Sequence, residues 1–342
     1  MTAEPHIDGD SAVDDASPGR SVYRSGRLTT VAGVIMAIGA AAAMGSTAPA
    51  LKALAASELT PVNLIQARTA IGAVVLMTAA VALRRGRLGI AKRDWWLIAV
   101  YACISLAVNQ VIFTMSLERL PVGVALLLEY TSPLLVALWM RWVQHVRLPR
   151  TAWIGIVIAV GGLALTAQVW AGFRLDALGV LLGLIAAVTM ASRFLVAERG
   201  LMRYDPLVLA AWGSATAALA LAVMTPLQPF PFRQLGGSVD LGIAGGMSIA
   251  VLLLWIGIIG MAGGMILGVV AQQRISPASA NVILSLEVVV GTALAALLLD
   301  ERLTGAQLSG AITMLVGIVI AQRGLSRVPR AGSSDRNARR LD

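Results

Sequence analysis

Apolar residues dominate ten stretches of this 342-residue chain, separated by breaks that contain proline, glycine or charged residues. A helix needs about 20 mostly apolar residues to cross about 30 Å of hydrocarbon, and each stretch is that long. The stretches lack the apolar–polar alternation of membrane β-barrel strands, so helix is the predicted state. The ten predicted spans cover residues 28–51, 60–83, 95–116, 120–140, 151–171, 177–197, 206–227, 249–271, 277–299 and 303–322.

The composition favours a membrane protein over a soluble one. Hydrophobic residues make up 58% of the chain and charged residues 13%, and the mean hydropathy is +0.81. A soluble domain of this size needs a polar coat that such a composition does not supply. The net charge of +9 does not indicate a nucleic-acid partner, because the basic residues lie in short loops and aromatic residues for base stacking are few.

The distribution of basic residues predicts the orientation in the membrane. Of 27 Lys and Arg residues, 20 lie on the side of the two termini, five on the opposite side and two within spans. Loops rich in Lys and Arg stay in the cytoplasm, so both termini are expected there. We therefore expect a multi-pass protein of a bacterial inner (plasma) membrane, with residues 1–27 as a disordered cytoplasmic tail and 323–342 as a disordered basic one.

An internal repeat emerges when the sequence is shifted by 155 residues. Gly155 then falls on Gly310 and Gly162 on Gly317. Each repeat would hold five spans, in residues 28–171 and 177–322. An odd number inserts the second copy upside down, an arrangement that places a substrate site near the bilayer midplane. The predicted fold is an all-α membrane protein with ten transmembrane helices in two inverted five-helix repeats; the alternative is a duplication in a non-transporting protein.

Four charged residues fall within the predicted spans, where a charge is costly and therefore faces a cavity or a partner. Glu129, beside Tyr130, is a candidate to bind a substrate ammonium group or a coupling proton, or to form an internal salt bridge. Glu287 has the same two interpretations. Arg68 is expected to pair with one of these acids or to meet a substrate carboxylate. Arg193 lies near the cytoplasmic end and is expected to snorkel.

Uncharged polar residues in the spans complete the candidate site. Asn109 and Gln110 lie in the third span, and Asn281 and Ser285 in the ninth. All four are expected to line the cavity. For the two residues of the third span, the equal alternative is that they hold helices together by hydrogen bonds. Close helix packing is predicted at several glycines: Gly161, Gly162, Gly257, Gly260, Gly263, Gly264 and Gly268.

Signatures of catalysis are missing from the sequence. It contains no phosphate-binding glycine loop, no metal-spaced cluster and no nucleophile elbow. The lone Cys103 lies in a span and offers no disulfide. We therefore expect that the protein is not an enzyme and that it binds no cofactor and no metal. Transport would be driven by a gradient, with protons as the candidate coupling ion.

Two stretches resemble a known family. The residues LE at 286–287 and LDERLT at 299–304, followed by Gly310, are similar to the closing "LEP … LGExLT … G" pattern of the EamA-type drug/metabolite transporter superfamily. Val288 stands in place of the proline and Asp300 in place of the glycine. The resemblance covers about residues 30–322 and implies a ten-span secondary transporter.

A second motif narrows the resemblance. The run LEYTSPL at 128–134 is similar to the fourth span of the threonine/homoserine exporter branch, with Ser132 in place of a glycine. The likeness implies export of small polar metabolites, with amino acids such as threonine or homoserine as the expected substrates, by alternating access. An importer or exchanger of another metabolite and a non-transporting membrane scaffold are the alternatives, and monomer and homodimer both stay open. The expected substrate-binding residues are Glu129, Tyr130, Arg68, Asn109, Gln110, Asn281, Ser285 and Glu287.

Overall fold

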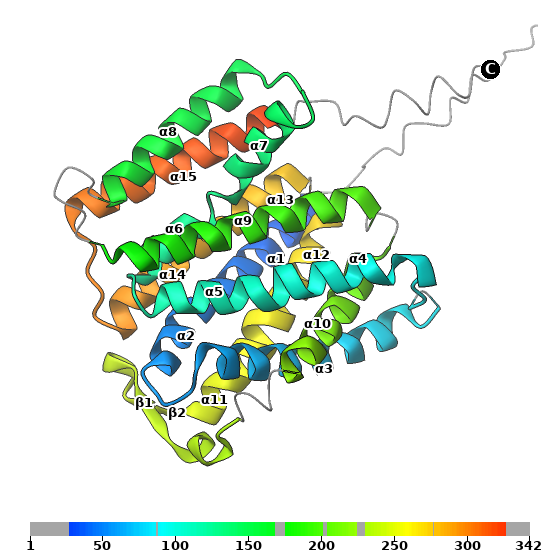
Figure 1. The fold of residues 1–342 in the computed structure, drawn as a ribbon, viewed down its shortest axis with the longest axis vertical. Helices are drawn as coiled ribbons and strands as arrows, with labels where there is room; N and C mark the ends of the chain where they lie inside the picture. The colour runs from blue at the N-terminus through cyan, green and yellow to red at the C-terminus, as the bar shows by residue number, and fades with distance from the viewer. Residues whose placement is uncertain are drawn as a thin grey trace, which may run out of the picture.

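The fold is described by a computed structural model, which covers residues 27–86, 88–167, 175–200, 204–223, 230–275 and 277–325. Helices account for nearly all of the regular structure in these ranges (Figure 1). One antiparallel hairpin pairs β1 (Ser238–Asp240) with β2 (Gly246–Ser248). The predicted disordered tails lie outside the described residues, except that α1 begins at Arg27 and α15 continues to Leu325.

The first half of the chain, up to residue 167, consists of helical rods, some of which are interrupted. The third rod contains a short 3-10 turn, η1 (Lys92–Asp94), and a π-helical segment, η2 (Tyr101–Val108). The helices of this half are α1 (Arg27–Gly45), α2 (Thr47–Ala55), α3 (Pro61–Arg84), α4 (Trp95–Val100), α5 (Asn109–Leu117), α6 (Val122–Glu129), α7 (Ser132–Trp142) and α8 (Arg150–Ala167).

The second half, from residue 175, is built in the same manner. Its third rod also contains a π-helical segment, η7 (Trp255–Gly263), and is preceded by the β-hairpin and two short 3-10 turns, η5 (Phe232–Gly236) and η6 (Gly242–Ala244). The helices of this half are α9 (Ala177–Gly200), α10 (Pro206–Ala222), α11 (Ile249–Leu254), α12 (Gly264–Gln272), α13 (Pro277–Leu284), α14 (Leu286–Leu298) and α15 (Gly305–Leu325).

Local sequence signals set the start of two helices. Thr60 caps α3: the Asn63 backbone N–H donates to the Thr60 hydroxyl at 3.3 Å, and the Asn63 side chain accepts from the Thr60 N–H. Asp205 caps α10 with a single bond, in which its side chain accepts from the Leu207 N–H. Pro61 and Pro206 then occupy the first helical position, where a missing N–H costs nothing.

The helices are of the lengths and apolarity expected in a bilayer. Among the described residues, six rods are long and apolar enough to cross a membrane: Thr30–Ala55, Pro61–Arg84, Lys92–Leu117, Val122–Trp142, Ile249–Gln272 and Gly305–Gly324. Shorter apolar helices occupy the other four predicted spans, at Arg150–Thr166, Ala177–Ser192, Pro206–Ala222 and Val282–Leu298. Large apolar side chains such as Val74, Val157 and Leu219 point outward, about two-thirds exposed. Such a surface suits lipid, and the chain is a multi-pass helical membrane protein.

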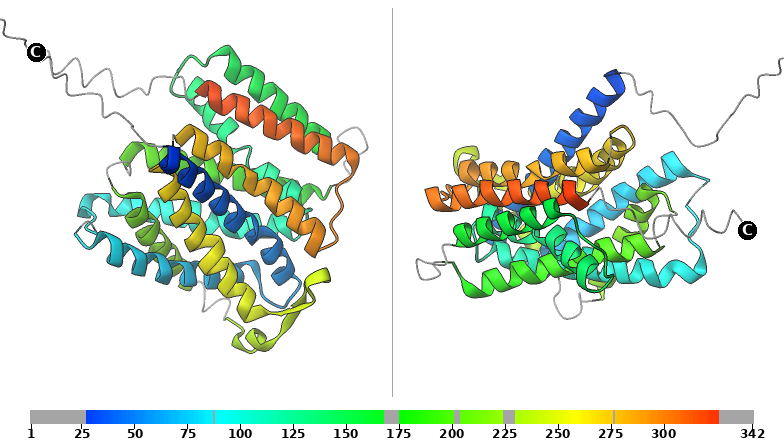
Figure 2. Two further views of the ribbon diagram at one scale, coloured as in Figure 1. Left: turned by 180° about the vertical axis from the view of Figure 1, so that it is seen from behind. Right: turned by 90° about the horizontal axis from the view of Figure 1, so that it is seen from above.

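Helix pairing follows one pattern in both halves. The first rod of the first half packs on the third rod of the second half, as α1 against α12. Conversely, α9 packs against α5. The view from behind (Figure 2, left) shows α1 between α12 and α14. The last rods of the two halves, α8 and α15, lie side by side at one edge of the molecule (Figure 1).

Helix interruptions also recur at matching positions. The fourth rod breaks between α6 and α7, at Tyr130–Thr131, and the ninth breaks between α13 and α14, at Ser285. Shifting by 155 residues places Tyr130 on Ser285 and η2 on η7, within one residue. The fourth-rod break lies beside Pro133, which removes a backbone donor from the helix. The two breaks position the candidate site.

Candidate functional site

The two helix breaks bring together an aromatic hydroxyl and a carboxylate from different halves. Tyr130, at the end of α6, donates its hydroxyl to Glu287 Oε2 at 2.7 Å. The Tyr130 hydroxyl also lies 3.4 Å from the Leu284 carbonyl, at the end of α13. Glu129, the last residue of α6, is buried with 6% of its surface exposed. Three of the predicted site residues therefore lie at the junction of the two broken rods.

Arg68 supplies the positive charge of the site. It lies eight residues into α3, and its Nη1 donates to Gln110 Oε1 at 2.5 Å. Glu287 and Glu129 both attract the guanidinium electrostatically. The sequence allowed a direct salt bridge between Arg68 and one of these acids; instead the hydrogen-bond acceptor is the Gln110 amide. Among the described residues no acceptor lies within hydrogen-bonding distance of the buried Arg68 Nε.

Asn109 and Gln110 form a polar relay that ends on the second half. Gln110 Nε2 donates to Asn109 Oδ1 at 3.1 Å. The Asn109 Nδ2 group in turn donates to the Ala186 carbonyl at 2.8 Å and to the Thr189 hydroxyl at 3.0 Å, both on α9. Asn109 is fully buried. This geometry fits the alternative in which Asn109 holds helices together rather than lines a cavity, because both of its amide hydrogen bonds go to α9.

Two other predicted residues have different outcomes. Ser285 is buried, and its hydroxyl donates to the Val282 carbonyl at 2.6 Å. It therefore supports the break between α13 and α14 rather than offering its donor to a ligand. Asn281 belongs to α13, but its side chain lies outside the described part of the structure, as does that of Arg193 on α9.

The resulting site has groups of both charges in a partly buried setting: Glu129 is buried and the other side chains are half-buried. Two carboxylates, one guanidinium, one phenol and one amide come from α3, α5, α6 and α14. Fixed charges far from water are costly unless they pair with each other or with a ligand. A solute carrying both an ammonium and a carboxylate group complements such a set. Among the described residues, no group of three His, Cys, Asp or Glu side chains is placed to hold a metal ion.

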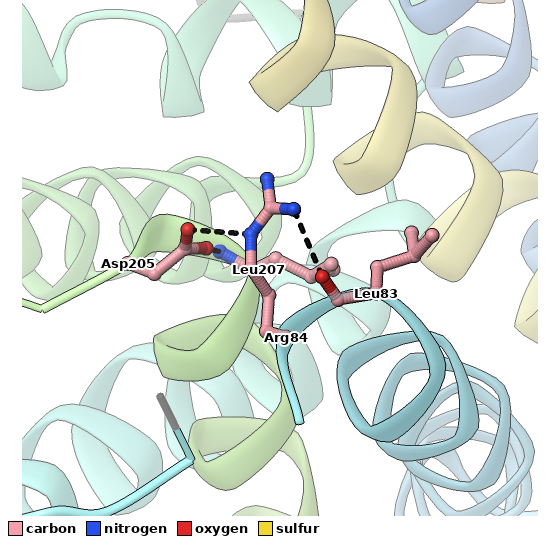
Figure 3. Close-up of polar contacts among 4 residues, drawn as sticks. All are labelled: Leu83, Arg84, Asp205 and Leu207. Atoms are coloured by element: carbon pink, nitrogen blue, oxygen red, sulfur yellow. Dashed lines mark hydrogen bonds and ion pairs between the residues drawn. The ribbon is translucent and has the colours of Figure 1, made fainter. Parts of the chain in front are cut away.

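An ion pair at the Arg84 end of α3 joins the two halves. Arg84 Nε donates to Asp205 Oδ2 at 2.8 Å, while Asp205 Oδ1 accepts from the Leu207 N–H at 2.9 Å (Figure 3). Partial burial works to raise the pKa of Asp205. The hydrogen bonds from Arg84 and Leu207, together with the charge of Arg84, outweigh that effect and hold the pKa below its usual value.

A cavity of about 490 Å³ opens beside this pair. Its lining mixes side chains from the end of α3, the start of α10 and the end of α12: Leu83, Arg84, Arg85, Gly86, Asp205 and Gln273. The pair therefore lies at the wall of an open space at one end of the helical bundle.

A second inter-half ion pair lies near the opposite end of α3, and sequence reasoning missed it. Lys52, on α2, pairs with Glu301 Oε1 in the loop between α14 and α15. Glu301 Oε2 accepts from the Val122 N–H, at the start of α6, at 2.8 Å. Lys52 also donates to the Leu120 carbonyl at 2.5 Å. The available signal was the position of Glu301 in the LDERLT stretch, but its partner is distant in sequence.

These features define a multi-pass helical membrane protein with a cluster of charged and polar side chains where its two halves meet. The EamA-like transporter family model matches the chain twice, over residues 31–168 and 177–322, and the chain belongs to that family. Members of this family are membrane transporters and generally not enzymes.

Relatives point the same way. The chain is 26% identical to the uncharacterized transporter YwfM of Bacillus subtilis (strain 168), over 85% of this chain and 92% of that one. It is 24% identical to the uncharacterized transporter sll0355 of Synechocystis sp. (strain ATCC 27184 / PCC 6803 / Kazusa), over 44% of this chain and 52% of that one. A solved crystal structure with 20% identity has a TM-score of 0.54 and covers 86% of this chain and 95% of its own, which is a likeness of fold alone.

Proposed function

We propose that this transporter exports small zwitterionic metabolites, amino acids such as threonine or homoserine, by alternating access. The observation that carries the proposal is the charge set of the site. Arg68 can receive a substrate carboxylate on its Nε and remaining Nη donors, while Glu129 and Glu287 provide negative charge for an ammonium group. An anionic solute without an amine would leave two acids facing one cation, which disfavours nucleotide-like substrates.

The architecture that we propose is ten transmembrane helices in two inverted five-helix repeats. Three features support it: the double match of one family model, the exchanged pairing of α1 with α12 and of α9 with α5, and the coincident helix interruptions. The site would lie near the bilayer midplane between the repeats. Both termini would be cytoplasmic in a bacterial inner membrane, because 20 of the 27 basic residues then lie inside.

The test is efflux of labelled amino acids from proteoliposomes that contain the wild type or Glu129→Gln. The variant keeps the shape of the side chain but removes its charge, so we expect efflux to fall to the background of empty liposomes. Glu118→Gln is the matched control, because Glu118 follows the end of α5 and is exposed. Equal transport by wild type and Glu129→Gln would rule out the role of Glu129.

Substrate class and direction need a separate measurement. A panel of competitors that lack either the amine or the carboxylate should fail to inhibit amino-acid efflux, because each loses one of the two charge contacts. Whole-cell accumulation of the labelled solute, instead of loss, would favour the importer or exchanger alternative. A chain that neither moves nor is stabilised by any metabolite of the panel would favour the scaffold.

A further inference from the structure

Two inter-half ion pairs, Lys52–Glu301 and Arg84–Asp205, lie at opposite ends of one helix. Lys52 is close to the start of α3, at Pro61, whereas Arg84 is its last residue. With 24 residues and a rise of about 1.5 Å per residue, α3 separates these ends by about 36 Å. Each pair joins a cation of the first half to a carboxylate of the second half. Both pairs are closed in the structure.

The carboxylates of both pairs also accept a hydrogen bond from a backbone N–H at the start of a helix. Asp205 accepts from the Leu207 N–H at the start of α10, and Glu301 accepts from the Val122 N–H at the start of α6. A carboxylate at a helix N-terminus is favoured by the unpaired N–H groups and the helix dipole. Each carboxylate thus fixes the position of a helix as well as its cation.

The helix that Glu301 holds leads directly to the candidate site. All eight residues of α6, from Val122 to Glu129, are buried. The helix has no internal break, and Tyr130 follows at its end. A displacement of Glu301 relative to Val122 would therefore move the start of a rigid segment whose other end carries Glu129 and Tyr130.

We propose that Lys52–Glu301 and Arg84–Asp205 are the two gates of the transport cycle, and that Glu301 acts as a positioning residue for Glu129 through α6. Opening one end requires its ion pair to separate while the other stays closed. This inference rests on the alternating access proposed above. The gates are distinct from the substrate site: neither ion pair includes a residue that we assign to substrate binding.

Two other ion pairs in the described residues are more exposed than these. Arg302 and Asp300 pair at 3.2 Å within one loop, with both side chains more than four-fifths exposed. Arg119 and Asp176 also join the two halves, at 3.5 Å, and Asp176 accepts from the Gly179 N–H at the start of α9, but both side chains are about two-fifths exposed. Water and salt screen such exposed pairs, so they hold helices weakly.

The test uses cysteine accessibility in the full chain, reconstituted in nanodiscs so that both ends meet the reagent. Cys103 is the only cysteine, and Cys103→Ser provides a background without thiols. Val124→Cys reports on the Lys52 end, because Val124 lies in the first turn of α6 and is 1% exposed. Ala210→Cys reports on the Arg84 end, because Ala210 lies near the start of α10 and is 5% exposed. The readout is the rate of reaction with a water-soluble maleimide.

We expect reciprocal changes. Glu301→Gln keeps an acceptor for the Val122 N–H but removes the ion pair, so it should raise labelling at position 124 about five-fold and lower it at position 210. Asp205→Asn should do the reverse. Lys52→Met breaks the first pair from its other side and should reproduce the Glu301→Gln pattern. Arg302→Gln, the exposed control in the same loop, should change neither rate.

Two outcomes would overturn the gates. If each substitution changes labelling only at its own end, the pairs are structural ties; if both ends become accessible together, the variant has loosened the bundle. The labelling needs no substrate, so it is independent of the proposed substrate class. Reciprocal labelling without amino-acid efflux would leave the gates and reject the substrate class. Loss of efflux in Glu129→Gln without reciprocal labelling would support the substrate site and reject the gates.

Discussion

Adjacent glycines on α8 should respond in opposite ways to the same substitution. A Cβ built on Gly162 would overlap the Met314 backbone nitrogen and lie 2.7 Å from the Gly310 carbonyl oxygen, both on α15. A Cβ on Gly161 would meet no atom within 4 Å. Gly162→Ala must therefore push two backbones apart, because no side-chain rotation relieves the contact. Gly161→Ala only adds a methyl group to the outer surface.

The magnitudes follow from these contacts. Overpacking of this kind costs about 1–3 kcal/mol, which corresponds to a fall of about 1–4 °C in melting temperature for a chain of 342 residues. Gly161→Ala removes the entropic penalty of a helical glycine and should leave the melting temperature unchanged or raise it by about 1 °C.

The assay is the shift in intrinsic fluorescence of the eight tryptophans on heating in detergent, with all variants at one scan rate because such unfolding is often irreversible. Equal melting temperatures for Gly161→Ala and Gly162→Ala would refute the close approach of α8 and α15. A fall for both would show that the outer face of α8 is covered rather than open to lipid.

Three further outcomes follow from single residues. Asp300 has a positive φ of 51°, so Asp300→Gly should stabilise the protein by about 1 kcal/mol; a lower melting temperature would contradict this. The pKa of Asp205 is lower in the folded protein than in the unfolded chain. The pair with Arg84 therefore stabilises the fold above the unfolded pKa of about 4, and this stabilisation is lost as the pH falls from there through the folded pKa. The difference in melting temperature between wild type and Asp205→Asn should therefore shrink as the pH falls below about 4, and a constant difference would contradict this expectation. Tyr130→Phe removes the hydrogen bond to Glu287 and should slow efflux about ten-fold or more at equal expression, whereas an unchanged rate would take this bond out of the mechanism.

The sequence was sufficient for the helices because the bilayer leaves so few alternatives. A long apolar run has to satisfy its backbone internally, so its period and length alone predict a helix. Two of the prolines in the breaks between apolar runs, Pro61 and Pro206, stand at the first position of a helix. The break between α6 and α7 lies beside Pro133, whereas its counterpart at Ser285 has no proline nearby and shows only in the structure.

The hydrogen-bond partners of individual side chains could not be predicted from the sequence, because they depend on how each helix is rotated about its axis and how the helices cross. Gly161 and Gly162 look alike in the sequence, yet only Gly162 faces α15; Gly268 also proves to have open space around it. Arg68 had three candidate partners and bonds a fourth, Gln110, since the two neighbours Asn109 and Gln110 point to different helices.

The two helix breaks explain why polar residues of the site divide into two kinds. An interrupted helix frees backbone carbonyls that lipid cannot satisfy. At the first break the Thr131 hydroxyl donates to the Leu128 carbonyl at 2.7 Å, and at the second the Ser285 hydroxyl donates to a carbonyl three residues back at 2.6 Å. These hydroxyls support the backbone locally. Tyr130 and Glu287 are thereby left to interact across the junction between the halves. Substituting Thr131 or Ser285 should therefore disturb folding, and substituting Tyr130 or Glu287 should disturb transport, although all four lie within one turn of a break.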